Sequence, residues 1–354
     1  MKRACKVVIL AALACSFAGC ASGPMYTALV SGNSLQRASD IPRIESGSKI
    51  HKPVYGSELV YKSHLSEDIR QPALFRAKYH PSCSANGWMA VKGVMKNGTE
   101  YPVVLDTGAS QHFFVNDIHI RENKLAIQPF ATSKVNPVGW GRCLLPQITL
   151  GDITWLNWPC LYREQHTQIR LFGLPVAEDK AVIAGLKVLM EFKYIAFDSI
   201  NKEIEFSLEK SFEPTEPKLW AKYPFTIEED FSGNALLFAE FPIGGRPTHL
   251  QLDTGSGRGL AVGQSFWDDI RDRMGKVRLT KGTDLYPYIG QLPCKHGIIK
   301  ELRFGDRIIQ NAHISVLPDD SPVLDLDNRG LLGMQYFADT ILVIDFEHKL
   351  VWVK

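Results

Sequence analysis

Short apolar runs, separated by Gly, Asn and Asp turn signals, dominate the chain from about Val60 onward. This pattern predicts a protein rich in β-strands. One run, VVLDTGAS (103–110), leads apolar residues directly into Asp-Thr-Gly. A single copy of that motif would indicate only a turn, because Asp can bond its own backbone and Gly tolerates positive φ.

The same motif occurs a second time, in HLQLDTGSG (249–257). A hairpin turn is predicted at the same distance before each Asp, at Asn97-Gly98 and at Gly244-Gly245. Downstream, each copy has strands around a Gly-Asp turn, then an apolar-apolar-Gly segment, a short helix and two final strands. An internal repeat of this kind predicts two similar β-rich lobes.

The two copies of the repeated unit have the same spacing between their aspartates. From Asp106 to Asp198 is 92 residues, and from Asp253 to Asp345 is also 92. Asp198 and Asp345 each end a predicted strand, where we expect them to cap a turn. A turn motif has no reason to recur inside a duplicated unit of this length, so the two Asp-Thr-Gly copies need another explanation.

The paired motifs, each followed by an apolar-apolar-Gly segment (VIAGL, 182–186, and GLLGM, 330–334), resemble the pepsin and retropepsin superfamily of aspartic proteases. The resemblance covers roughly residues 85–354, and VIAGL departs further from the family pattern than GLLGM. It implies an all-β fold of two retropepsin-like β-barrel lobes, related by a pseudo-two-fold axis, with the active site in the cleft between them. It also implies an aspartic endopeptidase acting on a peptide or protein substrate.

The resemblance assigns the catalytic roles to Asp106 and Asp253. Two carboxylates about 3 Å apart cannot both ionise, so one serves as acid and the other as base. Glycine after each Asp-Thr would let the backbones approach closely, and the resemblance implies that the two threonines interlock the lobes. The expected supporting residues of the two loops are Thr107, Gly108, Ala109, Thr254, Gly255 and Ser256.

The two loops differ after the glycine, where Ala109 corresponds to Ser256. A hydroxyl that donates to a carboxylate lowers its pKa. We therefore expect Asp253 to be the more readily ionised partner if Ser256 reaches it. The alternative is that Ser256 satisfies only the backbone of its own turn.

Two further segments are candidates for mobile flaps over the substrate, NPVGWGRC (136–143) and YPYIGQLPC (286–294). Trp140 and Tyr288 would be their aromatic tips, although both could equally be buried aromatics on hairpins. A short helix is predicted over 263–274, with Ser265 as its N-cap.

The N-terminus has the pattern of an export signal. A basic start precedes an apolar run from Val7 to Ala18, which is shorter than the about 20 residues that span a bilayer. The junction FAGC resembles the lipobox of bacterial lipoproteins, which implies lipidation of Cys20 and an anchor in the cell envelope; we expect it at the periplasmic face of an outer membrane. We expect the signal peptide at 1–19, the lipidated Cys and a tether at 20–80, and the lobes at 81–212 and 213–354.

Charge, motifs and cysteine content limit the classes of partner and ligand that we expect. The net charge of +2 with no basic stripe argues against nucleic acid. No CxxC, HExxH or nucleotide-binding motif is present, so we expect no metal and no cofactor. The duplication predicts a monomer. Four cysteines would remain in a mature exported chain, and Cys143–Cys160 is the first pairing to test against free buried thiols; the four are Cys83, Cys143, Cys160 and Cys294.

Two functions stay open from the sequence. The first is a lipid-anchored aspartic endopeptidase. The second is a catalytically silent envelope lipoprotein that binds peptides or acts as a scaffold, because fold alone does not establish function. Both Asp residues and both Gly residues are intact, which favours the enzyme.

Overall fold

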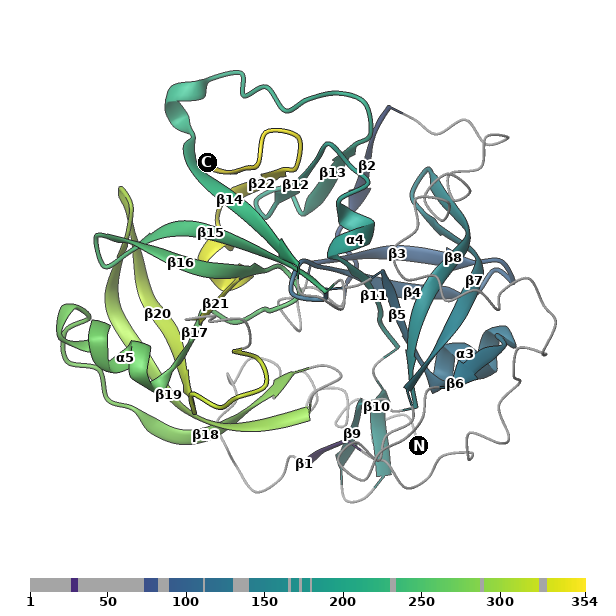
Figure 1. Ribbon diagram of the computed structural model, residues 1–354, viewed down its shortest axis with the longest axis horizontal. Helices are drawn as coiled ribbons and strands as arrows, with labels where there is room; N and C mark the ends of the chain where they lie inside the picture. Colours follow the sequence, from purple (N-terminus) through teal and green to yellow (C-terminus); the bar gives the residue numbers. More distant parts are fainter. Residues whose placement is uncertain are drawn as a thin grey trace, which may run out of the picture.

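Strands of two similar lobes make up most of the computed structural model (Figure 1). The first lobe is drawn in blue and teal, the second in green and yellow, and a sheet built from both lies above them. The described residues are 27–30, 73–81, 89–110, 112–129, 140–164, 167–171, 174–178, 180–229, 234–286, 290–324 and 330–354.

The first lobe is a seven-stranded sheet that closes on itself. Its strand order is β3-β4-β11-β5-β8-β7-β6, and β3 also pairs with β7. Helix α3 (Asp117–Asn123) follows β5, and α4 (Leu186–Leu189) follows β11. The strands are β3 (Ala90–Met95), β4 (Glu100–Asp106), β5 (Phe113–Asn116), β6 (Ile127–Pro129), β7 (Trp140–Leu150), β8 (Ile153–Arg163) and β11 (Val182–Gly185).

The second lobe repeats this topology. Its strand order is β18-β19-β20-β17-β21-β16-β15, and β15 also pairs with β19. Helix α5 (Gln264–Ile270) takes the place of α3 and continues into the 3-10 turn η5 (Arg271–Arg273), while the turn η6 (Met334–Phe337) takes the place of α4. The strands are β15 (Ala235–Ile243), β16 (Arg246–Asp253), β17 (Leu260–Gly263), β18 (Thr280–Tyr286), β19 (Gly290–Phe304), β20 (Arg307–Leu317) and β21 (Gly330–Gly333).

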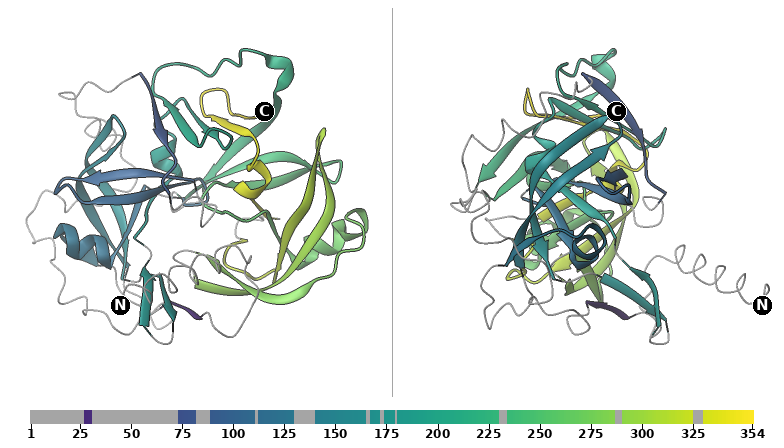
Figure 2. Two further views of the ribbon diagram at one scale, coloured as in Figure 1. Left: turned by 180° about the vertical axis from the view of Figure 1, so that it is seen from behind. Right: turned by 90° about the vertical axis from the view of Figure 1, so that its right-hand side faces the viewer.

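A shared sheet joins the lobes, in the order β14-β23-β22-β12-β13-β2. At its centre, β12 of the first lobe pairs antiparallel with β22 of the second, with Ala196 opposite Val343. The pseudo-two-fold axis therefore passes between these two strands, which Figure 2 shows from behind. The six strands are β2 (Leu74–Lys78), β12 (Tyr194–Asp198), β13 (Glu203–Ser207), β14 (Ala221–Glu229), β22 (Ile341–Asp345) and β23 (Leu350–Val353).

Two features lie outside the duplicated pattern, whereas β2 belongs to it, as the counterpart of β14 at the other end of the shared sheet. The 3-10 turn η4 (Pro217–Leu219) precedes β14. A small sheet joins β1 (Thr27–Val30), β9 (Thr167–Leu171) and β10 (Leu174–Glu178). Strand β2 lies in the segment 20–80, which we expected to be a tether, yet it pairs with β13 along its whole length. The predicted fold class, two β-barrel lobes about a pseudo-two-fold axis, is confirmed.

The predicted turns form where the sequence places them. Asn97-Gly98 joins β3 to β4, and Gly244-Gly245 joins β15 to β16 with φ values of +58° and +79°. Such angles require glycine, or a residue that tolerates the left-handed region. Asp198 accepts hydrogen bonds from two backbone amides of the turn after β12, and Asp345 does so from one after β22, so both cap turns as predicted.

The predicted cap of α5 is wrong. The helix begins at Gln264, and its N-cap is Gly263, which has no side chain to donate or accept. Ser265 lies inside the first turn instead. Its amide and its hydroxyl both donate to Asp319, at 2.9 Å and 2.6 Å. A carboxylate from a distant loop therefore caps this helix.

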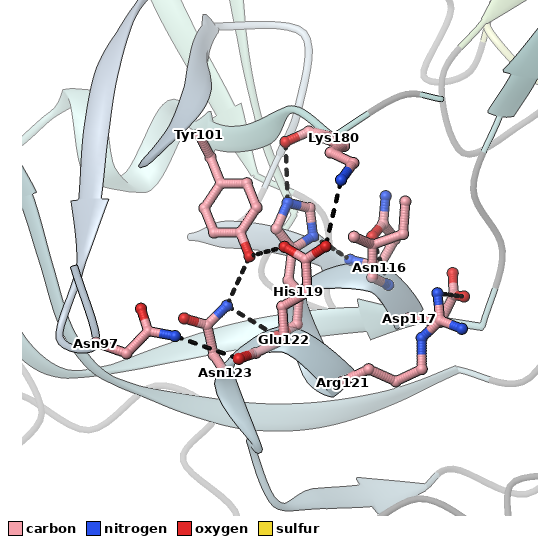
Figure 3. A network of polar contacts seen from close by, with 10 residues as sticks. Asn97, Tyr101, Asn116, Asp117, His119, Arg121, Glu122, Asn123 and Lys180 are labelled. Carbon is pink, nitrogen blue, oxygen red and sulfur yellow. Dashed lines mark hydrogen bonds and ion pairs between the residues drawn. The ribbon is translucent and has the colours of Figure 1, made fainter. Parts of the chain in front are cut away.

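The corresponding helix of the first lobe is held by a network around His119 (Figure 3). Asn116 caps α3 through its side chain, and the Asn116 amide donates to Nδ1 of His119 at 3.0 Å. The other ring nitrogen donates to the Lys180 carbonyl oxygen at 3.1 Å. The imidazole is fully buried, so its charged form is unfavourable, and burial lowers the pKa of His119 to about 4.

The described cysteines are free thiols. Cys143 and Cys160 lie directly opposite each other on β7 and β8, as a disulfide would require, and the two thiols are buried. The sequence left two alternatives for this pair, a disulfide and free buried thiols, and the structure has the free thiols. Cys83 lies outside the described residues. Within the described part of the chain, no helix has both the length and the apolar character to cross a membrane.

Candidate active site

Each Asp-Thr-Gly loop begins where a central strand of its lobe ends. Asp106 is the last residue of β4, and Asp253 is the last residue of β16. The apolar-apolar-Gly strands β11 and β21 run parallel to them, which puts Gly185 opposite Asp106 and Gly333 opposite Asp253. All four residues of β11 and all four of β21 are buried. Apolar packing therefore fixes the ends of β4 and β16, which carry the two carboxyl groups.

The loops are held by equivalent backbone hydrogen bonds. Leu186 N–H donates to the Ala109 carbonyl oxygen at 2.7 Å, and Met334 N–H donates to the Ser256 carbonyl oxygen at 2.8 Å. These four residues occupy corresponding places in the two halves. The larger departure of VIAGL from the family pattern therefore does not alter the backbone frame of the first loop.

The two threonines connect the lobes directly. Thr107 Oγ1 donates to the Leu252 carbonyl oxygen at 2.5 Å and accepts from the Thr254 amide at 3.1 Å. Thr254 Oγ1 donates to the Leu105 carbonyl oxygen at 2.7 Å and accepts from the Thr107 amide at 3.0 Å. Both side chains are fully buried. This symmetric set of four bonds fixes one loop against the other.

The carboxyl groups meet across the pseudo-two-fold axis. A Cβ added to Gly108 would lie 2.7 Å from Oδ1 of Asp253, and a Cβ added to Gly255 would overlap the Asp106 carboxyl group. Each glycine therefore leaves the space that the opposite carboxyl group occupies. A methyl group at either position would push the two aspartates apart.

Burial raises the pKa of both aspartates, and their mutual contact shifts the two pKa values in opposite directions. For Asp253, burial acts first and the charge of Asp106 second, and together they hold its pKa well above the usual range. Burial also raises the pKa of Asp106, but the hydrogen bond from Asp253, and then the amides of Gly108 and Ala109 that donate to its Oδ1 at 2.8 Å and 3.1 Å, favour its charged form. Asp253 is therefore the proton-bearing partner and Asp106 the carboxylate.

This order reverses the expectation drawn from Ser256. The Ser256 hydroxyl accepts a hydrogen bond from the Arg258 amide at 3.2 Å, and no bond joins it to Asp253 among the described residues. The sequence left two interpretations of Ser256 open. In the structure its hydroxyl bonds the backbone of its own turn, which is the second interpretation. The Ser256 amide, rather than its hydroxyl, interacts with Asp253, so the hydroxyl does not favour the charged form of that carboxyl group.

The expected flap tips are only partly described. Trp140 is the first residue of β7, and its ring packs under the Arg163 guanidinium, 5.2 Å from the ring centroid. Tyr288 lies outside the described residues, as does Cys20. Tyr286, the first residue of the second predicted flap segment, lies at the end of β18 and was not itself predicted as a site residue. Burial raises its pKa first, and the charges of Asp284 and Asp253 add to that effect, which puts this tyrosine near the paired aspartates.

Two β lobes of one topology, each bringing an Asp-Thr-Gly loop to a common pseudo-two-fold axis, define the pepsin-like fold. No family model matches the chain, and no curated protein matches it. Similar solved structures include an aspartic proteinase from Irpex lacteus, with 11% identity and a TM-score of 0.44 over 79% of this chain and 97% of that one. They also include basic 7S globulin from soybean, with 12% identity and a TM-score of 0.40 over 80% and 94%.

A second seed globulin, conglutin gamma from lupine, is similar at 9% identity with a TM-score of 0.40, over 80% of this chain and 95% of that one. The similar structures thus include a proteinase and seed globulins. At such identities and scores, none of these likenesses bears on activity. Any argument about function must come from the residues of the site.

Proposed function

We propose that this protein is an aspartic endopeptidase. The observation that supports the proposal is the pair Asp106 and Asp253, held face to face by two glycines and two interlocked threonines, with different proton affinities. Hydrolysis of a peptide bond without a metal or a covalent nucleophile needs an acid and a base at one site. Two carboxyl groups with separated pKa values supply both.

The proposed cycle begins with Asp106 charged and Asp253 protonated. Asp106 takes a proton from a water molecule while the water oxygen bonds to the peptide carbonyl carbon, and Asp253 gives its proton to the carbonyl oxygen. The resulting diol is neutral. Asp106 then gives its proton to the amide nitrogen, the C–N bond breaks, and Asp253 recovers a proton from a hydroxyl group. Both residues return to their starting states.

A silent binding protein with the same fold is the second candidate function. A binder would have no need for opposed carboxyl groups, because two buried like charges destabilise each other. The intact pair, with both glycines that admit it, therefore favours catalysis. The substrate in either case is an extended peptide or a protein segment.

Cleavage of a peptide library across pH, with and without a statine-type inhibitor, tests the proposal. We expect inhibitor-sensitive cleavage that declines as the pH rises past the raised pKa of the pair, because the shared proton is then lost. Peptides that bind but emerge uncut at every pH would contradict the enzyme and support the binding protein.

The proposal includes a lipid anchor at Cys20 on the periplasmic face of an outer membrane, which rests on the lipobox resemblance of FAGC. We expect Cys20→Ser to abolish partitioning into the detergent phase, because the acyl chains would have no attachment site. Cys15→Ser, which changes another cysteine of the same segment, should leave partitioning intact. Full partitioning of Cys20→Ser would contradict the anchor.

A further inference from the structure

Three side chains with metal-binding chemistry lie together on one hairpin of the second lobe. Strands β18 and β19 pair with Asp284 opposite Leu292, Gly282 opposite Cys294 and Thr280 opposite His296. Residues two apart on a strand share one face, so Asp284, Cys294 and His296 lie on the same side of the hairpin. Their ligand atoms all lie within 4.8 Å of one another.

The thiol and the imidazole already point at each other. Cys294 Sγ is 3.2 Å from Nε2 of His296. The other ring nitrogen, Nδ1, lies 3.4 Å from the Ser315 hydroxyl on the neighbouring strand β20. A metal-binding histidine usually has such a partner on its second nitrogen, which fixes the orientation of the ring.

Gly282 makes room for this arrangement. A Cβ at position 282 would lie 2.7 Å from Nε2 of His296, the atom that faces the thiol. Any other residue at this position would therefore displace the imidazole. The gap between Asp284 on one strand and Cys294 and His296 on the other exists because this position has no side chain.

The Asp284 carboxylate is the buried member of the group. Its side chain is 2% exposed, and neither oxygen meets a donor of the described residues in hydrogen-bond geometry. The positive group nearest to it in the described structure is the Arg258 guanidinium, 2.9 Å from Oδ1, and Arg258 is itself 40% exposed. A buried carboxylate is costly unless it is paired or binds a metal, and an exposed arginine can turn away to solvent.

We propose that Asp284, Cys294 and His296 form a zinc site. Thiolate, imidazole and carboxylate are the three ligand types that zinc takes in proteins, and three of them leave one coordination position for water or another ligand. Zinc would also join β18 to β19. Because Arg258 lies five positions after Asp253, binding at Asp284 would change the ion pair that links the Asp253 loop to this hairpin.

The thiol must lose its proton when zinc binds. Zinc therefore replaces the thiol proton, which is released to solvent, and the apparent affinity should increase with pH. No metal was predicted from the sequence because it contains no CxxC or HExxH motif, whereas these ligands come from separate strands and meet only in the folded hairpin.

Titration of the purified full chain with Co²⁺, used as a spectroscopic probe for the zinc site, tests the proposal. We expect one equivalent to give the visible bands of tetrahedral cobalt and a thiolate-to-cobalt charge-transfer band, all removed by Zn²⁺. Cys294→Ser should remove the charge-transfer band. Cys143→Ser, which alters a buried thiol of the other lobe, and His313→Gln, which alters a histidine of β20, should leave it unchanged.

A second measurement guards against a variant that fails to fold. Zn²⁺ should raise the melting temperature of the parent, since a ligand bound only by the folded state stabilises it. The His296 side chain is 31% exposed, so the fold should tolerate a change there. His296→Gln should remove most of that increase in melting temperature and weaken binding at least tenfold. No charge-transfer band at stoichiometric Co²⁺, or a band that persists in Cys294→Ser, would overturn the proposal. Neither readout depends on peptidase activity.

Discussion

At the scale of single residues, the environment of each carboxyl group decides its role. Asp106 and Asp253 belong to the same motif, yet Asp253 has the higher pKa because it is buried against the charge of Asp106, whereas Asp106 accepts a hydrogen bond from Asp253. Two acids of the same Asp-Thr-Gly motif thus acquire opposite tasks. The difference arises from packing across the axis and could not be read from the motif.

The raised pKa of Asp253 predicts a stability effect. A carboxyl group whose pKa is higher in the folded state contributes stability below its unfolded pKa and loses it as the pH rises through the folded pKa. Asp253→Asn should therefore increase the free energy of unfolding above neutral pH, by on the order of 1–3 kcal/mol, and have little effect near pH 3. Urea unfolding at several pH values measures this.

Asp198→Asn is the matched control, because Asp198 ends a strand but caps an ordinary turn. It should not stabilise the protein at any pH. If Asp253→Asn proved destabilising at high pH, the two carboxyl groups would not repel each other as described.

His119 gives an independent pH prediction. Its folded pKa of about 4 lies below the unfolded value of about 6.5, so the unfolded chain binds more protons between these pH values. Stability should fall as the pH drops through this window, by up to roughly 3 kcal/mol. His119→Gln keeps an acceptor for the Asn116 amide and removes the titration. Parent and variant should therefore diverge in thermal melts below pH 6, and parallel curves would contradict the buried neutral imidazole.

At the scale of elements, the sequence predicted the features that depend on residues close together in the chain. The hairpin turns at Asn97-Gly98 and Gly244-Gly245 depend on residues that are adjacent in the chain, and they form as predicted. The cap of α5 was wrong because its true partner, Asp319, lies 54 positions from Ser265. For the same reason Tyr286 and the Asp284 group were missed, since their neighbours come from other strands.

The interlocked threonines give a prediction for the loops as elements. Thr107→Val should lower the free energy of unfolding by roughly 2–5 kcal/mol, because it leaves the buried Thr254 amide and the Leu252 carbonyl oxygen without a partner. Thr107→Ser keeps the hydroxyl and should cost much less. A loss for Ser as large as that for Val, measured by urea unfolding, would show that the methyl group contributes as much as the hydrogen bonds and would contradict this account of the loops.

At the scale of the whole molecule, duplication is the organising fact. The strands of the first lobe have counterparts in the second, and the pairing of β12 with β22 makes one sheet of both. The sequence predicted this architecture because the repeat preserves both motif and spacing. The proton order within the pair was not predictable, since it depends on how two loops that lie 147 positions apart meet.

The central claim is that Asp106 and Asp253 act as one site within one chain, and the activities of Asp106→Asn, Asp253→Asn and the double variant test it most directly. We predict that each single change removes nearly all of kcat/KM, more than the roughly 10²–10⁴-fold typical of one acid or base, and that the double change costs little more. Asp198→Asn should keep full activity. Substantial activity in Asp253→Asn, with none in Asp106→Asn, would show that the site needs the first lobes of two chains and would contradict the account.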